Sequence, residues 1–412
     1  MSLLNPFVLK KRHQAILLCC LSHYALAEDT KHVTMSGFGR IVAGQLATEE
    51  ANFRGYSNNV TARPNSLLGL QVNAYATDYL SFTAQGVLRT SEEETSKLDW
   101  LYATVQPDDN VSFKIGQLRT PLFMLSDVVD IGYAYQWITP PKQVYGAFIF
   151  PIFKGIDIYW GHSTDQLDTS LEVYYGKNDG EITLNNKTTD YEVFQQGGVI
   201  GSVRYNNFEF RASHHGGNAD IKQADLKSLA SSISQFGVYN DTVNSLSTKG
   251  VVKLTQLSVR YDEFNYFAAL EWTQIRPELQ TFIPKINSYY ATVGYIFNPV
   301  TVHLTFAESQ FDYNNFPTEI SQALAGMSTS DPRYSGLQQI VGGLNQISTG
   351  RSTDQLKSWT VGARWDVKPK LALKADVTFI QGEEDDTALF DSIQSGFDRK
   401  TALYQVAMEW VF

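Results

Sequence analysis

Histidine is the residue type in this sequence best suited to acid–base or nucleophilic chemistry, because its imidazole titrates near neutral pH. A Ser–His or Asp–His pair at one of these residues would suit a hydrolase. The sequence holds no Gly-x-Ser-x-Gly motif and no paired spacing of metal ligands. We therefore expect no enzyme, no cofactor and no metal site, and a hydrolase is only a remote alternative. Beyond residue 27 the histidines are His32, His162, His214, His215 and His303.

The composition narrows the class of protein and of partner. The 412 residues are 43% hydrophobic and 18% charged, and the mean hydropathy is -0.22. No stretch approaches the ~18 apolar residues of a spanning helix, which excludes a helical membrane protein. The formal net charge of -10 disfavours binding to nucleic acid or to anionic headgroups.

The first 27 residues predict a secretory signal peptide. Three basic residues at 10–12 precede a short apolar run at 15–21, and Ala25-Leu26-Ala27 fits the cleavage pattern. The signal carries three basic and no acidic residues, so its removal takes the net charge to -13. Cys19 and Cys20 both lie within it, which leaves residues 28–412 without disulfides or thiol chemistry.

Residues 28–412 repeat one unit, which is a strand, a tight polar turn, a second strand and a longer loop. Apolar and polar residues alternate along these strands, as in Trp359, Val361, Ala363 and Trp365. Seven hairpins, a first strand at about 33–46 and a last strand at about 400–412 make sixteen strands. An even number lets the ends pair and close a transmembrane antiparallel β-barrel, an all-β fold in which every backbone polar group is satisfied in lipid. The turns are expected around Thr77-Asp78, 107–110, 163–166, Asn206-Asn207, Asp262-Glu263, Asn298-Pro299 and 368–370.

The other ends of the strands carry longer loops. The spacing of Ile221, Leu226, Leu229 and Ile233 predicts a helix within 219–236, inside one of these loops. The expected loops are 47–65, 92–97, 122–154, 178–197, 216–249, 276–285, 313–354 and 383–398.

The last strand resembles the C-terminal assembly signal of bacterial outer-membrane barrels, which ends in Phe after apolar residues at alternate positions. The opposite reading is an amphipathic edge strand of a soluble two-sheet protein, but such an exposed edge would aggregate in water. The residues that carry this resemblance are Tyr404, Val406, Met408, Trp410 and Phe412.

The third long loop, at about 122–154, is too apolar to extend into water, so we expect it to lie against an inner wall. The stretch from Gly116 to Tyr145 resembles the inward-folded third loop of Gram-negative porins, especially those of marine and environmental gammaproteobacteria. The resemblance covers residues 28–412 in layout, and is specific only in this loop and the last strand. Enterobacterial porins carry a different, Gly-rich loop tip, so their pore size cannot be assigned to this protein.

In that family, acids on the loop face basic residues on the wall, and the resulting field filters polar solutes. By position, Asp127 and Asp130 are the candidate acids of the constriction loop. The alternative for each charged residue on a strand is an ion pair with a neighbouring charge in the lumen, without a role in selecting solutes. Strand parity gives the candidate pore-lining basic residues as Arg40, Lys114, Arg204, Arg211, Arg260, Arg364 and Lys374, and the acidic ones as Asp157, Glu172, Glu209, Glu271, Asp376 and Glu409.

The resemblance implies a porin of the cell outer membrane, through which small hydrophilic solutes and ions diffuse passively. It also implies a homotrimer, contact with outer-membrane lipid and lipopolysaccharide, and insertion by the barrel-assembly machinery. Basic lumen residues near the loop leave open a substrate-selective channel for anionic small molecules such as carboxylates. Adhesion or phage reception through the long loops would be compatible with either transport function.

Overall fold

A computed structural model describes residues 32–91, 96–146, 151–184, 187–278, 284–349, 351, 355–383 and 386–412, without the side chains of 182–184, 187 and 188. The predicted signal peptide, residues 1–27, lies outside the described residues. Within them, none of the helices has the length and apolar character needed to cross a bilayer.

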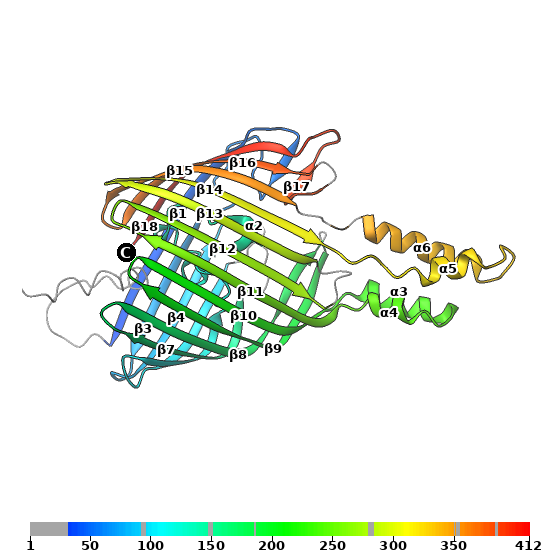
Figure 1. The fold of residues 1–412 in the computed structure, drawn as a ribbon, viewed down its shortest axis with the longest axis horizontal. Helices are drawn as coiled ribbons and strands as arrows, with labels where there is room; N and C mark the ends of the chain where they lie inside the picture. The colour runs from blue at the N-terminus through cyan, green and yellow to red at the C-terminus, as the bar shows by residue number, and fades with distance from the viewer. Residues whose placement is uncertain are drawn as a thin grey trace, which may run out of the picture.

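Sixteen antiparallel strands form one closed barrel, which confirms the predicted fold (Figure 1). Each strand pairs with its neighbours along the chain, and β1 pairs with β18 to close the ring. The strands of the barrel are β1 Val33–Leu46, β3 Leu67–Tyr75, β4 Leu80–Arg89, β5 Lys97–Val105, β6 Val111–Arg119, β7 Ile152–Ser163, β8 Leu167–Leu184, β9 Lys187–Tyr205, β10 Phe208–Ile221, β11 Lys249–Asp262, β12 Tyr266–Pro277, β13 Lys285–Phe297, β14 Val300–Asp312, β15 Leu356–Lys368, β16 Leu371–Gly382 and β18 Lys400–Val411.

The closing seam joins the two ends of the barrel. The β1–β18 ladder runs from Phe38, opposite Val411, to Leu46, opposite Leu403. Beyond it, the backbone N–H and C=O of Gly37 bond to those of Phe412, at 3.0 and 2.9 Å. The C-terminal residue therefore continues the seam, and no backbone edge is left open there.

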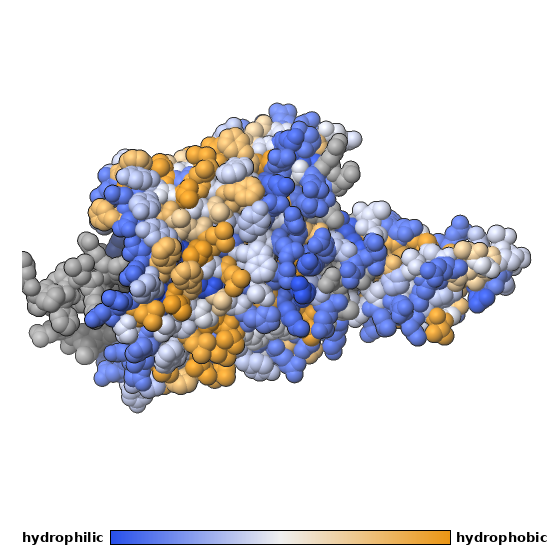
Figure 2. Space-filling model, viewed as in Figure 1, coloured by the Kyte–Doolittle hydropathy of each residue, from blue (hydrophilic) through white to orange (hydrophobic). Residues whose placement is uncertain are grey.

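The strands have two faces that meet different surroundings. Outward positions such as Val259, Leu270, Ala291, Phe306 and Trp359 follow one another across β11 to β15. Apolar residues gather in a band across the face of the barrel seen in Figure 2. Inward positions are polar and mostly buried, such as Gln256, Glu271 and Thr305. The mild mean hydropathy of the chain is thus an average over an apolar outer face and a polar inner face.

All seven predicted tight turns lie between consecutive strands of the barrel, which confirms them. Two predicted loops are wrong in extent. The segment 178–197 lies almost wholly within β8 and β9, which extend as a paired hairpin with Asp179 opposite Glu192. The segment 216–249 begins within β10, which continues to Ile221. In both places the ladder of backbone hydrogen bonds continues beyond the apolar alternation that marks the wall.

The longest loops carry helices at the end of the barrel opposite the C-terminus (Figure 1). The predicted helix is present as α3, Ala224–Phe236, and α4, Asn240–Ser245, follows it. The sequence did not predict α5, Glu319–Ala325, or α6, Tyr334–Thr349, in the loop between β14 and β15. The apolar sides of these four helices pack together around Ile233 of α3 and Leu337 and Leu344 of α6. A two-stranded sheet of β2, Ala51–Phe53, and β17, Phe390–Ile393, covers another part of the same end.

Candidate functional site: the loop inside the barrel

The described part of the loop between β6 and β7, residues 120–146, packs against the inner wall of the barrel. Within it, η2 covers Ser126–Val128, η3 covers Gly132–Ala134 and α2 covers Lys142–Tyr145. Its apolar side chains are buried against inward residues of β11 to β14, which explains how so apolar a loop is kept from water. The cluster contains Leu122, Phe123, Leu125, Tyr135, Trp137 and Val144 from the loop, and Leu254, Ile275, Ile286, Tyr290 and Ala307 from the wall.

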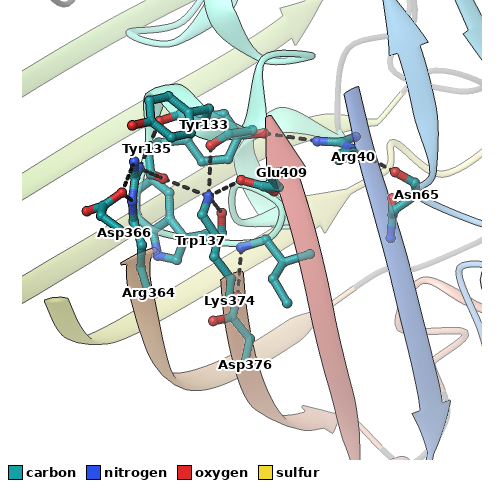
Figure 3. Close-up of polar contacts among 12 residues, drawn as sticks. Arg40, Asn65, Tyr133, Tyr135, Trp137, Arg364, Asp366, Lys374, Asp376 and Glu409 are labelled. Atoms are coloured by element: carbon teal, nitrogen blue, oxygen red, sulfur yellow. Dashed lines mark hydrogen bonds and ion pairs between the residues drawn. The ribbon is translucent and has the colours of Figure 1, made fainter. Parts of the chain in front are cut away.

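Lys374 of β16 holds the middle of the loop to the wall. Its Nζ donates hydrogen bonds to the backbone oxygens of Gly132, Tyr135 and Trp137, at 2.8, 2.8 and 2.6 Å (Figure 3). The same Nζ lies 2.6 Å from Oε2 of Glu409 on β18, and neither side chain is exposed. The charge of the ammonium is thus balanced by one carboxylate and three carbonyls beneath the loop.

Three further wall residues bind the same segment. The guanidinium of Arg364 donates to the backbone oxygens of Tyr133 and Tyr135, at 2.8 and 3.0 Å. Asp376 accepts a 2.8 Å hydrogen bond from the backbone N–H of Ile138, and Arg40 donates to the hydroxyl of Tyr135 at 3.1 Å. Figure 3 shows these contacts converging on the loop from β1, β15, β16 and β18.

The start of the loop is bound by β10 and β12. Arg211 donates to the backbone oxygen of Pro121 at 2.6 Å. Glu271, which has no exposed surface, accepts from the backbone N–H of Met124 at 2.7 Å and from the hydroxyl of Tyr145 at 2.6 Å. Four of the basic residues predicted from parity (Arg40, Arg211, Arg364 and Lys374) therefore contact the loop itself, as do the acids Glu271 and Asp376.

Asp130 belongs to a compact cluster of charges. Arg89 lies 2.7 Å from Asp99 and 3.0 Å from Asp130, and Arg119 pairs with the same two carboxylates. Burial opposes ionisation of Asp130, but the adjacent Arg119, Arg89 and Arg40 lower its pKa to about 2. The carboxylate is therefore ionised at neutral pH, and it joins the loop to the ends of β4 and β6.

Asp127 lies apart from that cluster and is exposed. It interacts electrostatically with Lys114 of β6 and with Glu172 of β8. Lys114 lies 3.5 Å from Asp157 of β7, directly across the ladder. Even without Glu172, the two acids Asp127 and Asp157 outnumber the one basic residue, Lys114, so acidic residues are in excess where the tip of the loop meets this wall.

The remaining predicted charges pair with one another near the tight turns. Arg204 lies 2.8 Å from Glu209, and Arg260 lies 2.6 Å from Asp262. Glu209 is opposite both Arg204 and Arg260 in the ladders of β10. These residues form a row of alternating charge at that end of the inner wall.

Sequence reasoning missed Arg89 and Asp99, which share the cluster with Asp130. Arg89 ends β4 and Asp99 faces inward on β5. Alternation from the outward Leu101 would place Asp99 on the outer face, and only the irregularity of the ladder, where Gln85 pairs with Trp100 and Gly86 with Leu98, turns it inward. The meeting of both residues with Asp130 depends on the path of the loop, for which the sequence has no local signal.

Two of the histidines lie in the wall of the barrel in pairs of the kind considered for a hydrolase, Ser213 with His215 and His303 with Asp376. His215 is buried and lies 2.8 Å from the hydroxyl of Ser213 and 3.0 Å from that of Tyr174. His303 lies 3.3 Å from Asp376 with no exposed side-chain surface, and His214 is on the outer face beside Thr255. In the described part of the chain, no group of three or more acidic or histidine side chains could hold a metal ion.

The comparisons place this architecture among known folds. No family model and no curated protein sequence matches the chain. OmpF of Salmonella typhi, solved in complex with daunomycin, is 11% identical; the match covers 92% of this chain and 97% of OmpF, with a TM-score of 0.56. The outer membrane channel DcaP of Acinetobacter baumannii is 10% identical over 92% and 97% of the two chains, with a TM-score of 0.53. An anion-selective porin from Comamonas acidovorans is 11% identical over 92% and 99%, with a TM-score of 0.51. The chain has the fold of these outer-membrane porins.

Proposed function

We propose that the protein is an outer-membrane channel through which small hydrophilic solutes and ions diffuse passively. The observation that carries this proposal is the closed barrel of sixteen strands, apolar outside and polar inside, with a loop fixed against its inner wall. A barrel of this size leaves room for water beside an inward loop. Diffusion through such a passage needs no bond to be made or broken, so the proposal includes no enzymatic activity.

The distribution of charge favours passage of cations over an anion-selective channel. Lys374, Arg364 and Arg211 direct their charges to backbone carbonyls of the loop. The exposed acid Asp127 of the loop and the acid Asp157 of the facing wall outnumber the one basic residue beside them, Lys114. A channel for carboxylates would require exposed cations at this place.

The purified protein should test the proposal in planar bilayers and liposomes. We expect stepwise conductance that rises with salt concentration, a reversal potential of the sign given by cation preference, and swelling rates that fall with solute size. Uptake of one class of carboxylates, faster than uncharged solutes of the same size, would support the selective channel instead. The absence of conductance from protein that migrates as a folded barrel would refute both.

Asp127 provides a sharper test of charge selection. Replacing it with asparagine removes an exposed charge without changing the size of the side chain, and should lower the cation-to-anion permeability ratio about twofold, since exposed charges contribute roughly RT or less in salt solution. Reversal potentials under a salt gradient measure this ratio. Asp109→Asn, at the tight turn between β5 and β6, is the matched control and should leave it unchanged. If Asp127→Asn and the unmodified protein have the same cation-to-anion permeability ratio, Asp127 does not contribute to charge selection.

We also propose that the chain is exported by a cleaved signal peptide, inserted by the barrel-assembly machinery, and embedded as a homotrimer among outer-membrane lipid and lipopolysaccharide. The outward exposure of Tyr404, Val406, Met408 and Phe412 on the final strand supports recognition of that strand during assembly. Cross-linking in native membranes would measure the number of subunits.

A further inference from the structure

The seam between β1 and β18 is the place where the barrel has no connection along the chain. The other neighbouring strands of the barrel follow one another in the sequence, and a turn or a loop joins each pair. β1 and β18 are held together by noncovalent contacts alone. At one end of the seam, two backbone hydrogen bonds between Gly37 and Phe412 fasten it. The other end lies among the long loops.

The two loops attached to the seam strands join each other at that end of the barrel. The loop at 47–66 leaves β1 and carries β2, and the loop described at 386–399 leads into β18 and carries β17 (Figure 1). β2 and β17 pair as a small antiparallel sheet, with Phe53 opposite Phe390. The rings of these two residues meet edge to face, with their centroids 5.2 Å apart. The first and last loops of the barrel are therefore in direct contact.

Hydrogen bonds extend this contact beyond the small sheet. The backbone N–H of Gly55 donates to the carboxylate of Asp391 at 2.7 Å. The backbone N–H of Gln394 donates to the backbone oxygen of Glu50 at 2.7 Å, and its side-chain amide donates to that of Glu49 at 3.1 Å. The loops are thus joined by directed polar contacts on either side of the aromatic pair.

The small sheet also packs onto the seam from inside the barrel. Leu46 of β1 and Leu403 of β18 are opposite each other at the end of the seam ladder, and both are buried. They belong to one apolar cluster with Phe53, Phe390 and Phe397 of the two loops. Separation of β1 from β18 at this point would expose these side chains to water, which is unfavourable.

The small sheet and the seam depend on one another. Gly55 and Asp391 are 336 positions apart in the sequence, and bringing such distant segments together in an open chain costs conformational entropy. When β1 and β18 are paired, the two loops already start side by side, so the small sheet forms at a lower entropic cost. By linkage, a contact that forms more readily when the seam is closed stabilises the closed seam by the same factor.

We propose that the paired strands β2 and β17 are a clasp that keeps the seam of the barrel closed at the loop end. Together with the contact between Gly37 and Phe412, the clasp fastens the seam at both ends. Because it needs both seam strands in place, the clasp forms after the barrel has closed. This role goes beyond the proposed channel function, since it concerns how the wall stays intact and not what passes through it.

Amide hydrogen exchange of the purified barrel in detergent, followed by mass spectrometry, tests the clasp. Segments 41–46 and 402–407 report opening of the seam, and segment 288–294 of β13 is the internal reference. Replacing both Phe53 and Phe390 with alanine removes the aromatic contact of the clasp. Exchange in the seam should become about tenfold faster or more, because it requires the seam strands to separate, while exchange of the reference stays the same.

Leu337→Ala is the matched control for the loss of buried apolar side chains. Leu337 has no exposed surface and packs within the cluster of α3 to α6, among the other long loops. Its replacement should leave exchange in the seam unchanged. Seam exchange at the unmodified rate in the variant Phe53→Ala, Phe390→Ala would overturn the proposal.

An engineered disulfide tests the clasp without disturbing its apolar contacts. Asn52 and Ser392 are exposed and directly opposite in the small sheet, a placement that suits a disulfide, and residues 28–412 contain no other cysteine. In Asn52→Cys, Ser392→Cys, exchange in the seam should be about tenfold slower in the oxidised protein than in the reduced one.

The matched disulfide control is Gln274→Cys, Asn287→Cys, which joins opposite residues of the consecutive strands β12 and β13. Its oxidation should not change exchange in the seam. Equal seam exchange in the oxidised and reduced forms of the clasp disulfide would overturn the proposal, even if the phenylalanine variant failed to fold. Neither measurement uses conductance, so failure of the clasp is distinguishable from failure of the channel proposal.

Discussion

Replacing Lys374 with methionine should destabilise the folded barrel by about 3–5 kcal/mol, the usual cost of removing one partner of a buried ion pair. Methionine has a similar length, so the change mainly removes the charge. It leaves Glu409 without its cation and three loop carbonyls without a donor, all beneath the loop. We expect a lower temperature for the shift between folded and unfolded gel mobility. Larger and noisier single-channel currents should accompany it, as the loop leaves the wall.

Two variants separate the ion pair from other effects of the substitution. Lys357→Met changes a half-exposed lysine of β15 that lies 3.7 Å from Glu308 on the outer face, and should cost less than about 1 kcal/mol. Adding Glu409→Gln to Lys374→Met removes the unpaired carboxylate and should recover part of the loss. If Lys374→Met has the thermal stability and quiet currents of the unmodified protein, the ammonium does not hold the loop.

Replacing Gly362 with valine should disrupt the same region from within the wall. Gly362 lies between His303 of β14 and Asp376 of β16 in the ladders. A Cβ at this position would collide with the imidazole of His303 and the carboxylate of Asp376. Both side chains are buried, so they cannot move aside without breaking the hydrogen bond that the backbone N–H of Ile138 donates to Asp376. Overpacking of this kind costs about 1–3 kcal/mol or more.

Gly201→Val is the matched control for this substitution. Gly201 lies on the outward face of β9, where an added Cβ would meet no atom within 4 Å. Valine favours strands, so the control should be neutral or slightly stabilising. Thermal unfolding followed by gel mobility compares the two variants. Similar behaviour of Gly362→Val and Gly201→Val would show that the wall adapts freely and that the contact with Ile138 is unimportant.

The barrel could be predicted from the sequence because its signals are local. The period-two alternation identifies each strand and its outward face, as along Trp359 to Trp365, and a polar turn such as Asn206-Asn207 marks each hairpin. Every such signal is contained within one hairpin, and the closure follows from counting the hairpins.

The missing features depend on contacts that are distant in the sequence. Parity places Lys374 on the inner face, but only the path of the loop determines that Gly132 and Trp137 cover it. The alternation of β8 and β9 weakens beyond Gly176, although their ladder continues to Leu184 and Lys187. The helix α6 has apolar residues at helical spacing, with Leu337, Ile340 and Leu344 buried, so its sequence carried a signal that the assignment of 313–354 as a loop did not use. The packing of α5 and α6 against α3 and α4 of another loop has no local signal.

Many polar contacts from the wall reach the backbone of the loop and not its side chains, which has a consequence for evolution at its exposed positions. Lys374, Arg364, Arg211, Asp376 and Glu271 recognise carbonyl and amide groups that every amino acid carries. Substitutions at positions such as Asp127 can therefore accumulate while the loop keeps its attachment. A lineage of such proteins could change which solutes it admits by point mutations in the loop, without an intermediate that fails to fold.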